Sequence, residues 1–152
     1  MYKRQVPSID HIHITVSDLE RAERFYDRLL PLLGFQLSNK EIDEVANAEY
    51  KIIEYHHRNF SLGIVSPRAA YRNEKVSRRK PGALHHVAFH ASSRAQVDVL
   101  YEQIKRLDAV IVHPPQYYPE YCADYYAFFF KDCEGIEYEV VHFDRERYFG
   151  RQ

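Results

Sequence analysis

The sequence lacks a long hydrophobic run, a hydrophobic leader and a set of cysteines. Its longest apolar stretch, YYAFFF (125–130), is far shorter than the ~20 residues that a membrane-spanning helix needs. The first residues, MYKRQVPSIDH, contain no hydrophobic segment of the signal-peptide type. Two cysteines, Cys122 and Cys133, are too few for a disulfide framework. We therefore expect a soluble cytoplasmic protein with no membrane partner.

The sequence also lacks an excess of charge of either sign. Lys and Arg together number 21 and Asp and Glu 22, so the formal net charge at pH 7 is −1. Proteins that bind nucleic acids or anionic membranes without a specific site rely on a positive excess. We expect neither partner. With 152 residues, 45% of them apolar, the chain can form one compact domain or two small halves that share a core.

The first half of the chain predicts a strand, a helix and three more strands. Residues 9–16 alternate between apolar and polar side chains, which is typical of a half-buried strand. Asp18 is expected to cap the following helix, LERAERFYDRLLPLLG (19–34), whose apolar residues recur at helical spacing. The three later strands are predicted at FQLSN (35–39), EYKIIEYHH (49–57) and FSLGIVS (60–66).

The second half repeats this order after a polar segment. Residues 67–82 have no periodicity, and we expect an exposed linker or lid whose basic run SRRK (77–80) faces solvent. A strand, LHHVAFHA (84–91), and a helix, SRAQVDVLYEQIKRLDA (93–109), follow. The remaining predicted strands are VIVHP (110–114), DYYAFFF (124–130) and IEYEVVHF (136–143).

The two halves align at an offset of 75 residues, which indicates an internal duplication. His11 aligns with His86, Phe25 with Leu100 and Tyr26 with Tyr101. Neither half alone can bury both faces of its sheet, so we expect the two to share a cleft. The prediction is an α+β fold in one domain (1–152). Its parts are a first βαβββ module (8–66), a linker (67–83) and a second βαβββ module (84–143).

Histidines and carboxylates gather on the face of each sheet that the helix leaves open. Strand alternation places His11 and His13 there in the first half, and His86, His90, Glu137 and Glu139 in the second. His85 is expected to point the other way, with Val87 and Phe89. Carboxylates in a mostly apolar cleft are costly unless they are paired, protonated or bound to a cation. Imidazoles and a carboxylate from three strands suit a divalent metal.

These residues resemble the vicinal oxygen chelate superfamily, which groups glyoxalase I, type I ring-cleaving dioxygenases, fosfomycin-modifying enzymes and bleomycin-binding proteins. The pattern consists of His11 followed at seven residues by Asp18, a helix with Phe-Tyr, His86 before an apolar strand, and DCEGIEYE (132–139). Cys133 and Glu134 depart from the Pro and Asp usual in that turn. The resemblance implies paired βαβββ modules and the metal ligands His11, His86 and Glu139. It also implies a homodimer; whether the cleft forms within one chain or between two stays open.

Departures from the pattern disfavour some of the enzyme classes in this superfamily. Glyoxalase I has a further ligand, a glutamate, where this sequence has Gly63, or Ile64 at the strict offset. The dioxygenases carry a histidine and a tyrosine at positions that correspond to residues 120–122 and 129. This sequence has no histidine at 120–122 and has Phe129 in place of the tyrosine, although Tyr125, Tyr126 or His113 could substitute. The fosfomycin enzymes need a cationic pocket, and the corresponding loop, YYPEYCADYY (117–126), contains no Lys or Arg.

The interpretation that remains is a metal-dependent glyoxalase-like enzyme of the lyase or isomerase type, which chelates a small substrate through two adjacent oxygens. One divalent ion is expected: zinc, iron, nickel, cobalt or manganese. His13 and His90 are candidate acid–base groups, or else supporting or solvated histidines. Tyr121 and Glu137 are candidate substrate contacts. Two alternatives stay open, an extradiol-like dioxygenase with non-haem iron and a non-catalytic small-molecule binder of the bleomycin-resistance type.

Overall fold

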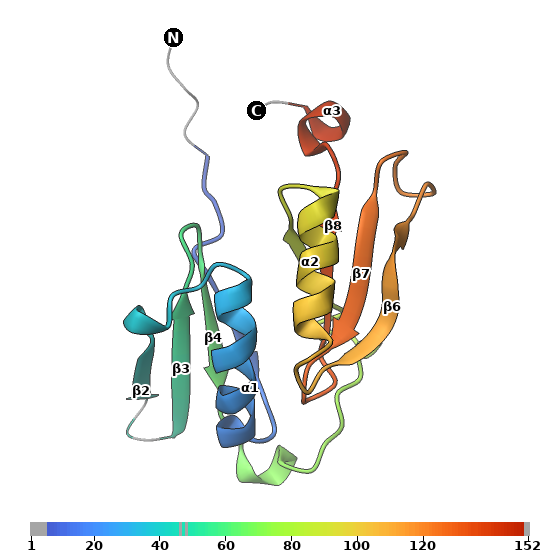
Figure 1. Cartoon of the computed structure of the whole chain (residues 1–152). Coiled ribbons are helices and arrows are strands. Elements are labelled where there is room, and N and C mark those ends of the chain that lie inside the picture. The colour runs from blue at the N-terminus through green and yellow to red at the C-terminus, as the bar shows by residue number, and fades with distance from the viewer. Residues whose placement is uncertain (1–5, 46, 48, 151–152) are drawn as a thin grey trace. The chain divides into compact units, whose positions relative to one another are not determined.

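Two four-stranded mixed sheets, each with one longer helix packed against it, make up the computed structural model of the chain (Figure 1). It describes residues 6–45, 47 and 49–150. The chain divides into two compact units, Met1–Asn73 and Glu74–Gln152. Each unit follows the order strand, helix and three strands, so the predicted α+β fold of two tandem βαβββ modules is confirmed. No helix in the described part of the chain is long and apolar enough to cross a membrane.

The first unit has the sheet order β1-β4-β3-β2, in which β1 runs parallel to β4 and the other pairs are antiparallel. The Asp18 side chain caps α1 as predicted, because it accepts a hydrogen bond from the backbone N–H of Arg21 at 3.0 Å. Apolar side chains of α1 and of one sheet face are buried together. The elements are β1 (His11–Thr15), α1 (Leu19–Leu32), two short 3₁₀ helices (Leu37–Asn39 and Ala69–Tyr71), β2 (Glu41–Val45), β3 (Tyr50–His56) and β4 (Ser61–Val65).

The second unit repeats this topology with the order β5-β8-β7-β6, again with its first and last strands parallel. A tight turn before β8 is held by Asp132, whose side chain accepts hydrogen bonds from the N–H groups of Glu134 and Ile136 at 2.8 Å. Gly135, at φ +93°, supplies the left-handed residue of that turn. The elements are β5 (Val87–His90), α2 (Arg94–Ile104), β6 (Val110–Tyr117), β7 (Tyr126–Lys131), β8 (Glu137–His142) and α3 (Arg145–Phe149).

The strand predicted at residues 35–39 is wrong. Phe35 is buried and packs against the rings of His57 and Phe60, and Leu37–Asn39 form a 3₁₀ turn. The strand that follows α1 is β2, an edge strand with almost entirely exposed side chains. An edge strand that buries nothing has no apolar alternation, so the hydrophobic pattern could not find it. The short helix α3 was not predicted either.

Alkaline pH is expected to destabilise the first unit through Tyr55. This side chain is buried and its hydroxyl donates to Asp27 Oδ1 at 2.9 Å. Burial, and then this hydrogen bond, raise the pKa of Tyr55 above its usual range. The unfolded chain loses the proton near pH ~10 while the folded chain keeps it, so stability falls by about 1.4 kcal/mol per pH unit above that point. Urea unfolding at about pH 9, 10 and 11 measures the slope, which Tyr55→Phe should reduce; equal slopes in both proteins contradict the prediction.

Candidate metal centre

Strand β8 places two carboxylates on the face of the second sheet that α2 does not cover. Glu137 and Glu139 alternate with Tyr138 and Val140, which are buried in the core on the other face. The exposed fraction is 5% for Glu137 and 2% for Glu139. A carboxylate so far from water is stable only with hydrogen-bond donors or positive charge beside it.

Glu139 has an imidazole and a phenol as its neighbours. His86 Nε2 lies 3.2 Å from Glu139 Oε2, and the Tyr125 hydroxyl donates to Glu139 Oε1. In the sheet ladder Glu139 lies opposite Ala88 and Phe129, so these partners approach over apolar residues. Burial, and then the hydrogen bond to Glu139, raise the pKa of Tyr125 above its usual range. The Tyr125 hydroxyl is therefore a proton donor that orients the carboxylate.

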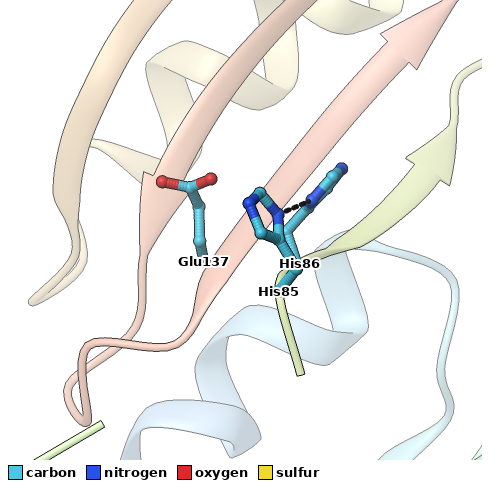
Figure 2. Close-up of side chains that lie close together, drawn as sticks. All are labelled: His85, His86 and Glu137. Carbon is cyan, nitrogen blue, oxygen red and sulfur yellow. Dashed lines mark hydrogen bonds between the residues drawn. The ribbon is translucent and has the colours of Figure 1, made fainter. Parts of the chain in front are cut away.

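His85 also faces this site, contrary to the orientation predicted from strand alternation. Its Nδ1 lies 2.8 Å from Nδ1 of His86 (Figure 2). Strand β5 begins only at Val87, so the alternation does not extend back to His85. Possible ligand atoms of His85, His86 and Glu137 all lie within 4.8 Å of one another. One of the two Nδ1 atoms must donate and the other accept, which requires at least one neutral imidazole.

Arg78 compensates the second carboxylate. Its guanidinium donates through Nη1 to Glu137 Oε2, and its side chain is 42% exposed against 5% for Glu137. Within the SRRK segment, which was expected to face solvent, Arg78 therefore turns toward a buried acid. The signal that could have found it was indirect, since a buried Glu137 needs a cation from a segment without periodicity.

A cavity of about 560 Å³ lies over these residues, within the second unit. Tyr121, a predicted substrate contact, lines it, together with the aromatic side chains of Tyr118, Tyr125 and Phe129. The remaining lining residues are Arg78, His85, His86, Val112, His113, Glu137 and Glu139. The cavity is thus lined by aromatic rings together with histidines and carboxylates.

The other predicted site residues are not among the described lining residues of this cavity. His90 is outside the described lining of this cavity, and its Nε2 is 2.9 Å from the carbonyl oxygen of Phe143. His11 and His13 belong to the first unit, where their ring nitrogens lie 2.7 Å from Asp10 Oδ2 and 3.0 Å from Glu54 Oε1. The catalytic roles of His13 and His90, and the ligand role of His11, stay predictions.

The donors of the second unit fit a divalent metal. Two ligand atoms that each lie ~2.0–2.2 Å from one ion are separated by about 2.8–3.6 Å, depending on the coordination geometry, and His86 Nε2 and Glu139 Oε2 are 3.2 Å apart. Glu139 suits the ion better than Glu137 does, because the guanidinium of Arg78 already compensates Glu137. The pair supplies one imidazole nitrogen and one carboxylate oxygen, donor types that first-row metals accept, at a spacing that also fits a direct ion pair.

Comparison with known proteins gives consistent matches along most of the chain. Residues 8–140 match the sequence model of the Glyoxalase/Bleomycin resistance protein/Dioxygenase superfamily. The chain is 30% identical over 131 residues to the uncharacterized protein YqjT of Bacillus subtilis (strain 168). The aligned region covers 86% of this chain and 95% of that protein.

Solved structures show the same likeness. A provisionally assigned glyoxalase from Bacillus halodurans has 27% identity and a TM-score of 0.68, over 88% of this chain and 94% of its own. A glyoxylase/bleomycin resistance protein/dioxygenase domain from Frankia sp. EAN1pec has a TM-score of 0.74 over 92% of this chain and 100% of its own. At 19% identity, the second likeness concerns the fold alone.

Proposed function

The chain belongs to the glyoxalase/bleomycin resistance protein/dioxygenase superfamily, and on this basis we propose that it is a divalent-metal-dependent enzyme of the glyoxalase-like type. In this proposal His86 and Glu139 hold the ion, with His11 as the third ligand taken from the sequence pattern. The substrate is a small molecule that presents two adjacent oxygens, and the reaction is of the lyase or isomerase type.

The observation that carries the proposal is the burial of Glu139 beside an imidazole. Its side chain is buried and lies 3.2 Å from His86 Nε2, at the edge of a cavity large enough for a small substrate. Polar side chains that converge on an aromatic cavity in this way are the usual mark of a binding or active site. A bound ion would supply Lewis acidity, which stabilises negative charge as it develops on a substrate oxygen.

The neighbouring residues of the chain have separate roles in this proposal. The Tyr125 hydroxyl keeps its proton and holds Glu139 in one orientation. His85 Nδ1 can accept from His86 Nδ1–H, which leaves the lone pair of His86 Nε2 on the side of Glu139. Arg78 neutralises Glu137, so that the cavity does not carry two uncompensated carboxylates. The rings of Tyr118, Tyr121 and Phe129 supply an apolar wall that limits water around the substrate.

A second candidate function, a ring-cleaving dioxygenase with non-haem iron, is favoured by two residues of the same cavity. Tyr125 donates to Glu139, and His113 lines the cavity with its ring centroid 6.0 Å from that of Phe129. These are a phenol and an imidazole of the kind the dioxygenase chemistry requires, at positions other than the usual ones. The two functions differ in the metal that they need.

Elemental mass spectrometry of protein purified without added metal or a histidine tag tests the proposal. We expect about one ion per chain that is lost in Glu139→Ala, as the family resemblance implies. Zinc, nickel, cobalt or manganese supports the lyase or isomerase, whereas iron together with oxygen uptake on a catechol supports the dioxygenase. Protein that remains free of metal after reconstitution with each ion contradicts both, and favours a non-catalytic small-molecule binder.

A further inference from the structure

A pair of like charges lies on the open face of the first sheet. Glu41 on β2 and Glu54 on β3 are directly opposite each other in the ladder. Possible ligand atoms of Glu41, Glu54 and His56 all lie within 4.8 Å of one another. Carboxylates directly opposite each other destabilise an antiparallel pair unless a positive charge compensates them. This arrangement therefore calls for a cation, either a protonated imidazole or a metal ion.

The orientation of His56 suits a metal ion in one of its two neutral tautomers. Its Nδ1 lies 2.7 Å from the Ser61 hydroxyl oxygen, and its Nε2 lies 3.3 Å from Glu41 Oε2. When Nδ1–H donates to the hydroxyl, the lone pair of Nε2 is left on the side of the carboxylates. Metal-binding histidines are usually held in this way, with one ring nitrogen on a protein acceptor and the other on the ion. The spacing of Nε2 and Oε2 also falls in the range of about 2.8–3.6 Å expected for two ligands of one ion.

Glu54 is held in place by a contact that only glycine permits. His13 Nε2 lies 3.0 Å from Glu54 Oε1, and Gly63 of β4 lies between these residues in the ladder. A Cβ atom at Gly63 would be 2.5 Å from His13 Cδ2 and 3.0 Å from Ile52 Cδ1. Glycine weakens the interior of a strand and often marks a close approach. Here glycine lets the His13 ring lie over β4 and orient a carboxylate of the cluster.

We propose that Glu41, Glu54 and His56 form a second divalent-cation site, made by residues of the first unit alone. Two carboxylates and one imidazole suit zinc and neighbouring first-row metals, with the other positions open to water. Glu41 is 61% exposed and His56 28%, so the ion can exchange with solvent. Ser61 and His13 are positioning residues, since each fixes a ligand without belonging to the ligand set.

Titration of zinc into chelator-treated full-length protein, followed by calorimetry, tests this site independently of the proposed function. Glu139→Ala should retain one class of zinc site, and Glu139→Ala with Glu41→Gln should lose it. Ser61→Ala in the Glu139→Ala background should weaken it by about tenfold, the usual loss for a partner outside the ligand set. Glu44→Gln is the matched control, because Glu44 lies on the same strand but pairs with Lys51 instead.

The outcomes separate the two sites. Zinc bound by Glu139→Ala and lost with Glu41→Gln supports the second site, whatever happens at His86. No zinc in Glu139→Ala, or zinc that persists unchanged after both Glu41→Gln and His56→Ala, overturns it. A thermal-shift measurement gives a further discrimination. Zinc should raise the melting temperature of Glu139→Ala and of its Glu44→Gln derivative, but not of its Glu41→Gln derivative; an equal rise in all three also overturns the site.

Discussion

Replacing Glu139 by alanine is expected to weaken metal binding in the second unit by more than about 100-fold, since even partners outside a ligand set are worth 10–100-fold. The change removes the one carboxylate that lies 3.2 Å from His86 Nε2 and is compensated by no guanidinium in the described contacts. The proposed catalytic activity should be lost with the metal. Elemental mass spectrometry of the purified variant, with calorimetric titration of the chelated protein, measures the effect.

Two further variants make the result specific. Glu139→Gln keeps the volume and an acceptor for Tyr125, so it should fold normally and still lose most of the affinity, because the charge is gone. Glu120→Ala changes an exposed carboxylate in the loop before β7, outside the described lining of the cavity, and should bind metal as the wild type does. Undiminished binding in both Glu139 variants would exclude this residue as a ligand and leave Glu137 as the acidic candidate.

Strand periodicity and the duplication predicted most of this architecture. The alternation in IEYEVVHF placed Glu137 and Glu139 on one face and Tyr138 on the other, and the structure has this arrangement. The 75-residue offset predicted two units of the same topology, which the sheet orders confirm. The resemblance to the vicinal oxygen chelate superfamily is confirmed as well. The faces of the strand residues could be predicted because side chains alternate with a period of two residues. The two units could be predicted because the second half of the sequence repeats the pattern of the first.

Arg78 and His85 could not be placed from the sequence, for a physical reason. Both precede β5 in a segment with no regular backbone, so no periodicity fixes the direction of their side chains. Arg78 reaches Glu137 across 59 residues of chain, and such a contact depends on tertiary packing. His11 shows another limit: the sequence pattern predicts it as a ligand, whereas the hydrogen-bond partner described for its ring is the neighbouring Asp10. Its ligand role, the homodimer and the cytoplasmic location stay predictions.

The largest loss of stability is expected from Tyr138→Ala, about 3–5 kcal/mol, the range for truncation of a large buried aromatic side chain. Tyr138 is fully buried and stacks on Phe130 with ring centroids 5.5 Å apart and on Phe89 at 6.2 Å. Its removal leaves a cavity between β8, β7 and β5 that these rings cannot fill. Urea unfolding followed by circular dichroism measures the difference in unfolding free energy.

The same substitution should also weaken metal binding, because Tyr138 lies between Glu137 and Glu139 on β8. The ring anchors the strand from the core side, and this anchoring holds the two carboxylates toward the cavity on the other face. Tyr138→Phe keeps the ring and should preserve metal affinity and most of the stability. Tyr71→Ala, at a side chain that is 56% exposed, should change stability by less than about 0.5 kcal/mol. If Tyr138→Ala loses stability but binds metal with unchanged affinity, the core does not position the site, and His86 and Tyr125 alone must hold Glu139 in place.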